Sequence, residues 1–260
     1  GPSLLTMPHF IDELFDLFNE NPRDHFNYKK KDISCKYFWD DGIKLNAYSD
    51  KSKFTNEINK VLGVNEELVL NYLLKAKRKY ELTKSMFLEQ SLHKLKTYFT
   101  KDLLNGLFNI FSFQINKTLN QVNVSELKEP HLVQLFNRFA TYNGSSPYKT
   151  PGMMTLVQHL EQEYGTYVSE KGMQNITSSL YELALRHGVN FKFNSYVSEI
   201  VVSNKRAIGI MVEEKSYESD IVISNMDVVP TYRNLLKNHY KPEKTLNQER
   251  SSSALIFYWG

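Results

Sequence analysis

The order of elements predicted between residues 165 and 227 constrains the fold of this chain more than any other feature. Gly172 begins a helical run that Gly188 closes. Strand patterns follow at 189–193, 197–203 and 207–213. Residues 220–223 (Asp-Ile-Val-Ile) are then almost wholly apolar, as buried parallel strands are. This order indicates part of an α/β domain.

The preceding part of the chain has a different pattern. Two alternating runs, at 33–39 and 43–48, flank Asp41-Gly42, which predicts a β-hairpin because glycine adopts positive φ at low cost. Helical periodicity follows, with Ser52 as a candidate cap for a helix through Leu62. Further helices are predicted from Glu66 onward and at 101–118, 125–141, 152–164 and 228–238. The residues at 254–260 read as a strand. The predicted fold class is therefore α+β.

Composition and charge exclude several functional classes. Apolar residues make up 41% of the 260 residues, enough for a hydrophobic core. A net charge of +3 is too small to indicate a nucleic-acid partner. The single cysteine, Cys35, precludes an internal disulfide and fits a reducing, cytoplasmic compartment. No apolar stretch is long enough to predict a transmembrane helix.

Residue types that often carry catalysis form no recognisable site. The seven histidines lack metal-ligand spacing, so no metal is predicted. Cys35 reads as a small buried apolar residue, and Ser145-Ser146 lack a Gly-x-Ser-x-Gly elbow. The basic runs 29–31 and 75–79 are either solvated faces or contacts with anionic lipid headgroups.

Several short motifs occur in order along the chain. They are Gly1-Pro-Ser-Leu-Leu-Thr-Met-Pro8 with Phe10-Ile-Asp-Glu-Leu-Phe15, Gly144-Ser-Ser-Pro-Tyr148, Gly172-Met173, Ser224-Asn-Met-Asp-Val-Val-Pro-Thr-Tyr-Arg233 and Phe257-Tyr-Trp-Gly260. Together they resemble the bacterial-type phytoene desaturase (carotenoid desaturase) family of FAD-dependent, amine-oxidase-like flavoproteins. Each motif is weak, but they occur in the family's order and at its approximate spacing across nearly the whole chain.

The resemblance implies an oxidoreductase that desaturates phytoene or a related isoprenoid hydrocarbon in carotenoid biosynthesis, with FAD as cofactor. Family members are much longer and carry an N-terminal Gly-x-Gly-x-x-Gly turn, which none of the eleven glycines here forms. We therefore expect a fragment that lacks the N-terminal dinucleotide-binding motif and the C-terminus, and that is inactive alone. Alternatives are a related flavoprotein (a carotenoid ketolase or a retinol saturase-like enzyme) and a non-catalytic apolar lipid-binding or interaction module.

The resemblance also implies a division of the chain into four parts. Residues 1–8 would cross from the FAD domain, 9–164 would form the substrate-binding domain, 165–230 would form the second half of the FAD-binding domain, and 231–260 would return to the substrate domain. The aromatic-rich region 52–164 would line an apolar tunnel, although ordinary core packing explains the same residues.

Five residues are candidates for cofactor binding on this resemblance. Val197 lies on the strand whose main chain would meet the adenine of FAD, with a plain buried valine as the alternative. Ser224 and Asn225 follow the apolar strand and would approach the FAD phosphates or ribose, or form an ordinary turn. Gly172 and Met173 begin a helix that would face the flavin ring and substrate. The family usually has two glycines there, whereas this chain has Lys171-Gly172. No catalytic residue is assigned.

A hydrocarbon substrate resides in the bilayer, so we expect peripheral attachment to the inner face of the cell membrane. Amphipathic candidates for this contact are 10–18 and 100–115.

Overall fold

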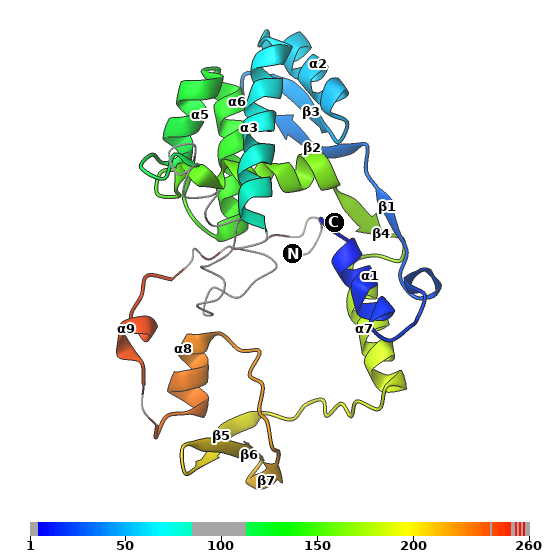
Figure 1. Cartoon of the computed structure of the whole chain (residues 1–260), viewed down its shortest axis with the longest axis vertical. Helices are drawn as coiled ribbons and strands as arrows, with labels where there is room; N and C mark the ends of the chain where they lie inside the picture. Colours follow the sequence, from blue (N-terminus) through cyan, green and yellow to red (C-terminus); the bar gives the residue numbers. More distant parts are fainter. Residues whose placement is uncertain are drawn as a thin grey trace. The chain divides into compact units, whose positions relative to one another are not determined.

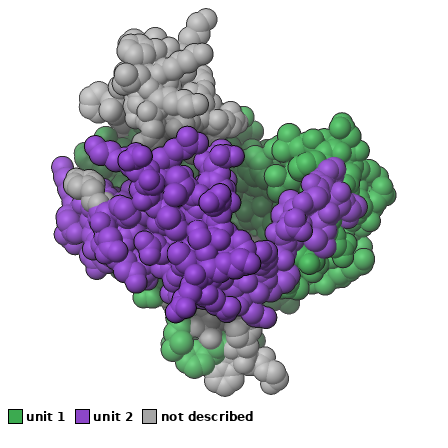
Figure 2. Space-filling model, turned by 90° about the horizontal axis from the view of Figure 1, so that it is seen from below, with its two compact units in different colours: residues 1–183, 251–260 green, residues 184–250 purple. Residues whose placement is uncertain are grey.

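The computed structural model describes residues 5–84, 113–239 and 241–250, together with Ser253, Leu255 and Phe257. The chain divides into two compact units, shown in different colours in Figure 2. Unit 1 comprises residues 1–183 and 251–260, and unit 2 comprises residues 184–250. The predicted helix at 101–118 lies mostly outside the described residues, and its described end at 113–118 contains no α-helix. Most of the strand predicted at 254–260 also lies outside them.

Unit 1 is mainly helical, with two short antiparallel strand pairs (Figure 1). Its α-helices are α1 (His9–Asp16), α2 (Lys51–Leu62), α3 (Glu66–Lys84), α5 (Leu119–Leu127), α6 (Pro130–Asn137) and α7 (Gln174–Arg186), the last of which runs into unit 2. Its other helical turns are η1 (Pro22–Asp24), η5 (Arg138–Asn143), η6 (Gly152–Val157) and η7 (Leu160–Tyr164). Its strands are β1 (Tyr28–Lys30), β2 (Ile33–Phe38), β3 (Lys44–Tyr48) and β4 (Tyr167–Ser169).

The predicted hairpin is confirmed. Strands β2 and β3 pair antiparallel, with Lys36 opposite Asn46. Gly42 takes a φ of 89° in the turn, a value that favours glycine. The helix cap was misjudged, however, because Asp50 rather than Ser52 accepts the hydrogen bond from the Lys53 backbone N–H at 2.8 Å. Ser, Asp and Asn all cap well, so composition does not choose between neighbouring candidates.

Helices α2, α3 and α6 pack with the hairpin around one core in unit 1 (Figure 1). Phe54, Ile58, Val69 and Phe136 are all at most 1% exposed within it. Phe136 packs edge-on against Tyr72, with ring centroids 4.9 Å apart. Burial of this many large side chains makes the core the main source of stability in the unit.

Two predicted helices are divided or altered. The helix predicted at 125–141 is interrupted between α5 and α6, because Pro130 lacks an N–H and is tolerated only in a first helical turn. The segment predicted as one helix at 152–164 forms the 3₁₀ helix η6 and the single π-helical turn η7. Single π-helical turns are frequent at functional sites, so this segment is a candidate part of one.

A second, smaller core joins α1 and α7. Phe15, Phe26 and Leu183 are buried together there. Beside it, β1 pairs antiparallel with β4, and Lys29 lies opposite Val168. The extended segment predicted at 167–168 is therefore confirmed as β4.

Unit 2 is built on one antiparallel sheet in the order β5–β6–β7. Its elements are β5 (Val197–Ser203), β6 (Arg206–Val212), β7 (Lys215–Glu218), α8 (Val228–Pro230), η8 (Thr231–Leu235) and α9 (Glu243–Leu246). Gly209 of β6 allows close approach of β7, because a Cβ there would lie 2.2 Å from the Tyr217 carbonyl oxygen. The strands predicted at 197–203 and 207–213 are confirmed, whereas β7 was missed.

Two predicted strands of unit 2 are wrong. Residues 189–193 and 220–223 form no strand, and no described strand pairs with them. Ile221 and Ile223 are 74% and 88% exposed, so the buried parallel strand is not formed. Alternation and apolarity mark residues that can join a sheet, but a strand also needs a neighbour to complete its hydrogen bonds. The α+β fold class is confirmed by the mixture of helices and antiparallel sheets.

Candidate functional site

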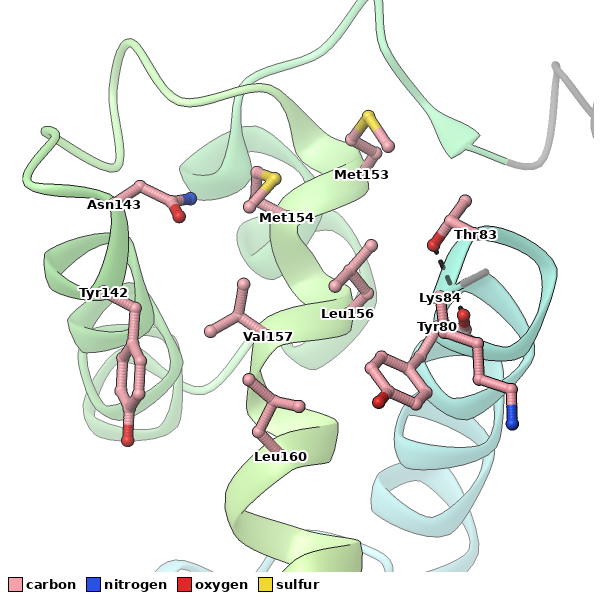
Figure 3. A pocket seen from close by; sticks show the side chains of 10 residues that line it. All are labelled: Tyr80, Thr83, Lys84, Tyr142, Asn143, Met153, Met154, Leu156, Val157 and Leu160. Atoms are coloured by element: carbon pink, nitrogen blue, oxygen red, sulfur yellow. Dashed lines mark hydrogen bonds between the residues drawn. The ribbon is translucent and has the colours of Figure 1, made fainter. Parts of the chain in front are cut away.

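Unit 1 contains an apolar cavity of about 340 Å³ between α3, η5 and the η6–η7 segment (Figure 3). It is lined by Tyr80, Thr83, Lys84, Tyr142, Asn143, Met153, Met154, Leu156, Val157 and Leu160. In Figure 3 Tyr80 is directed from α3 toward Leu160. The volume of this cavity lies at the lower end of the range for small-molecule pockets, about 300–1,000 Å³.

The hydroxyl groups on the cavity wall are bonded within the protein. The Tyr80 and Tyr164 hydroxyls are 3.3 Å apart. The Thr83 hydroxyl donates to the Lys79 carbonyl at 2.8 Å. The Tyr142 hydroxyl donates to Glu161 Oε1 at 2.5 Å. These groups are satisfied without a ligand, so the wall presents mostly carbon and sulfur.

A charged network lies behind Tyr142. Arg138 donates to Glu161 Oε2 through Nη2 at 2.7 Å and to the Tyr37 hydroxyl through Nε at 2.8 Å. Glu161 is only 2% exposed. Burial raises the pKa of Tyr37 and of Tyr142, and the hydrogen bond to Glu161 raises that of Tyr142 further. Both phenols are therefore protonated at neutral pH and act as hydrogen-bond groups rather than as bases.

Lys79 of α3 is the most deeply buried described lysine, at 5% exposure. Its ammonium donates to Gln114 Oε1 at 2.7 Å and to Thr155 Oγ1 at 2.9 Å. Burial lowers its pKa to about 8. The interpretation of 75–79 as a wholly solvated or lipid-facing run is therefore wrong at this position. Its helical spacing with Tyr72 and Ala76 was the available signal.

His159 lies between η6 and η7 and packs on Tyr80, with ring centroids 4.9 Å apart. It is 5% exposed, and burial lowers its pKa. The ring is thus neutral at pH 7 and contributes an aromatic surface rather than a charge.

Three predicted cofactor residues gather around one cleft of about 460 Å³ in unit 2. Val197, Ser224 and Asn225 line it together with Ile200, Ile210, Tyr217, Glu218, Ser219, Ile221, Val222, Ile223, Met226 and Leu235. The Ser224 hydroxyl lies 2.9 Å from the Thr231 hydroxyl, and the Asn225 side chain bonds to no described residue.

Gly172 and Met173 lie in unit 1, in the turn that precedes α7. Gly172 has a φ of 82°, and a Cβ there would meet nothing within 4 Å. The backbone is therefore open to close approach at Gly172. Gly172 and Met173 therefore belong to a different unit from the cleft that Val197, Ser224 and Asn225 line.

The described residues provide no metal site and no membrane-spanning helix. Within the described residues, no group of three or more His, Cys, Asp and Glu side chains could hold a metal ion. Cys35 is half-buried and packs against the core of unit 1. No helix in the described part of the chain is long and apolar enough to cross a membrane.

Residues 1–254 match the family described as flavin containing amine oxidoreductase. The chain belongs to this family, and membership implies FAD as the cofactor.

The chain is also similar to individual curated proteins. The chain is 50% identical over 260 residues to 1-hydroxycarotenoid 3,4-desaturase of Flavobacterium sp. (strain P99-3), covering all of this chain and 53% of that protein. It is 28% identical over 267 residues to 4,4'-diaponeurosporene oxygenase of Staphylococcus aureus (strain USA300), covering all of this chain and 52% of that protein. The chain thus spans about half the length of the curated relatives it matches.

A solved structure, an oxidoreductase from Methanosarcina mazei, gives a TM-score of 0.44 at 20% identity, covering 56% of this chain and 36% of that one.

The described residues fit part of an FAD molecule. The unit 2 cleft offers apolar side chains, the Ser224 hydroxyl and the unbonded Asn225 amide, which are groups that suit a purine or ribose. The Gly-x-Gly-x-x-Gly turn that holds the pyrophosphate does not occur in the sequence. The lining of the cleft therefore suits the adenosine portion of FAD.

Proposed function

We propose that the protein containing this chain is an FAD-dependent desaturase of acyclic carotenoids. The observation that carries the proposal is 50% identity along the entire chain to a 1-hydroxycarotenoid 3,4-desaturase. The apolar cavity of unit 1 supports it, because a polyene can be held only by apolar burial, about 0.8 kcal/mol per CH₂. At about 340 Å³ the cavity would take one end of a long isoprenoid.

The preferred substrate is a 1-hydroxylated carotenoid rather than phytoene itself. The family resemblance alone favoured phytoene or a close relative. The relative at 50% identity acts on a hydroxylated carotenoid, which supports the hydroxylated substrate instead.

The cofactor contacts follow the family resemblance. Val197 would meet the adenine through its main chain, and Ser224 and Asn225 would bind the ribose or phosphates. Gly172 and Met173 would face the flavin ring. When bound, FAD supplies the acceptor for the hydride removed from the substrate. The residues of this chain orient the polyene and exclude water, and the network of Arg138 and Glu161 holds the Tyr142 part of the cavity wall in place.

Membrane attachment is a further part of the proposal. Helix α1 and its C-terminal turn expose Phe10, Leu14, Leu17 and Phe18, each at least 41% exposed. We place this face on the inner surface of the cell membrane, where the substrate resides. The other amphipathic candidate, 100–115, lies mostly outside the described residues.

A second candidate is oxygenation of a carotenoid end group, since the relative at 28% identity is a 4,4'-diaponeurosporene oxygenase. A non-catalytic lipid-binding module is a third. The 260 residues alone would be inactive, because they lack a phosphate-binding turn. In this proposal, N- and C-terminal parts of the same protein complete the enzyme.

The test is product analysis in hosts that accumulate either phytoene or a 1-hydroxycarotenoid. Expression of the complete reading frame should add a double bond to the hydroxylated carotenoid, while expression of residues 1–260 alone should leave it unchanged. An oxygenated product would favour the second candidate, and unchanged carotenoids in both hosts would exclude both enzymatic functions.

A further inference from the structure

We propose that Asn143 binds the hydroxyl group at the end of a hydroxylated carotenoid and thereby selects hydroxylated over unhydroxylated polyenes. This inference rests on the proposed function and names a residue that determines its specificity. It arises from the distribution of polar groups around the unit 1 cavity.

Asn143 is the polar cavity residue best placed to bind a neutral ligand. The hydroxyls of Tyr80, Thr83 and Tyr142 are already bonded within the protein, as described above. The Asn143 side chain is exposed and makes no hydrogen bond to a described residue. In Figure 3 its amide is turned toward Met154, whereas the ammonium of Lys84 is turned away from η6.

The chemistry of an amide matches that of an alcohol. A hydroxyl donates one hydrogen bond and accepts others, and the Asn143 amide offers both an acceptor oxygen and a donor nitrogen. An ammonium such as that of Lys84 only donates and is strongly hydrated, so placing it against a polyene would be costly. The amide is therefore the better partner for an uncharged end group.

The backbone at Asn143 is held in a defined turn. Asn143 ends η5, and Gly144 follows in the left-handed region with a φ of 56°. The Gly144 N–H donates to the Thr141 carbonyl at 3.0 Å, and the Ser145 N–H donates to the Ala140 carbonyl at 3.3 Å. Phe139 and Ala140 of the same turn are 3% and 1% exposed and anchor it to the core. The side chain is thus carried on a rigid turn rather than on a loose loop.

Hydroxyl selection follows from the cost of burying an unpaired polar group. When the polyene fills the cavity beside Asn143, it displaces water from the substrate hydroxyl, which then loses hydrogen bonds unless the amide replaces them. With Asn143 present the hydroxylated end is accommodated, and without it the same end is disfavoured. One net hydrogen bond corresponds to a preference of about fivefold.

The experiment compares two substrates that share one polyene and differ only in the terminal hydroxyl. Values of kcat/KM for both are measured with the flavin-loaded product of the complete reading frame, as wild type and as Asn143→Leu. We expect Asn143→Leu to lower the ratio of hydroxylated to unhydroxylated kcat/KM about fivefold. Both kcat/KM values are measured on the same variant, so a smaller fraction of folded protein lowers both equally and leaves their ratio unchanged.

Two variants serve as controls. Met154→Leu conserves volume in the same cavity and should leave the ratio unchanged even where both rates change. Asn116→Leu makes the same substitution at an exposed position outside the cavity lining and should also leave the ratio unchanged.

An Asn143→Leu ratio equal to that of the wild type would overturn the inference while leaving the desaturase function standing. A wild type that converts neither substrate would overturn the proposed function and this inference together. The wild-type activity therefore distinguishes the two failures.

Discussion

The two units of this protein bury their apolar residues to different extents. In unit 1, Phe54, Ile58 and Val69 are each fully buried, and the core draws on helices and a hairpin from distant parts of the sequence. In unit 2, Ile200 and Val212 are buried on the sheet, but Ile221 and Ile223 are 74% and 88% exposed. Unit 1 therefore closes its core with its own residues, whereas unit 2 leaves a strand-like apolar segment uncovered. An apolar sequence pattern therefore forms a strand or a core only where a neighbouring element packs or pairs with it.

The largest predicted effect tests the closed core of unit 1. Phe136→Ala should lower the free energy of unfolding by about 3–5 kcal/mol, because it leaves a cavity beside Tyr72. Ile223→Ala in unit 2 should change it by less than about 0.5 kcal/mol, since that side chain is already in water. Urea unfolding of each variant measures both. Equal losses would contradict the comparison.

The next effect tests the sheet of unit 2. Gly209→Ala would place a Cβ 2.2 Å from the Tyr217 carbonyl oxygen, which is backbone and cannot move aside as a side chain can. We expect β7 to separate from β6 at a cost of about 1–3 kcal/mol. Hydrogen exchange should then quicken at the amides of β7 but not in α3 of unit 1. Unaltered protection of β7 would mean that this sheet is looser than described.

A third effect tests the charged network beside the cavity. Glu161→Gln keeps the shape but removes the charge that pairs with Arg138, and should cost about 2 kcal/mol. Glu163→Gln, which alters the more exposed pairs of that residue with Lys51 and Lys77, should cost at most about 1 kcal/mol. Thermal unfolding of the two variants provides the measurement, and a larger loss for Glu163→Gln would refute the assignment of the buried pair.

The smallest effect is a pH dependence at the hairpin of unit 1. His131 lies 2.7 Å from Glu129 Oε1 and 2.8 Å from Asp41 Oδ2. The hydrogen bond to Glu129, followed by that to Asp41, raises its pKa above the ordinary value of 6.5. Since the folded pKa is raised, this stabilisation is complete below about pH 6.5 and is lost as the pH rises through the folded value.

The size of this contribution should be below about 1 kcal/mol, because the pair is partly exposed. Stability curves from pH 5 to pH 9 should show the loss in the wild type and not in His131→Gln. A wild-type free energy of unfolding that rose, relative to that of His131→Gln, between pH 5 and pH 9 would contradict this prediction.

The sequence predicted unit 1 better than unit 2, and the reason is physical. The Asp41-Gly42 hairpin and helices α2 and α3 depend on local preferences, namely turn geometry, capping and a periodic apolar stripe. The failures at 189–193 and 220–223 concern strands, whose hydrogen bonds require a partner that local pattern cannot supply. Pro130 was a readable helix break within the segment predicted at 125–141.

The candidate site was predicted only in part. Val197, Ser224 and Asn225 came from family resemblance and lie around one cleft, yet their role in cofactor binding stays a prediction. Lys79, Arg138 and Glu161 were missed because a charged residue reads as solvated unless its partner is known, and these partners are up to 101 residues away in sequence. The four-part domain division likewise stays a prediction. The two compact units of the structure meet between Leu183 and Ala184, whereas the predicted division lies at 164–165.

The most direct test of the central claim is flavin absorbance of the purified complete-reading-frame product under anaerobic conditions. We predict stoichiometric FAD whose visible band bleaches when a 1-hydroxycarotenoid is added, together with a product that has gained a double bond. A protein that holds no flavin, or a flavin band that the carotenoid leaves unchanged, would contradict the account.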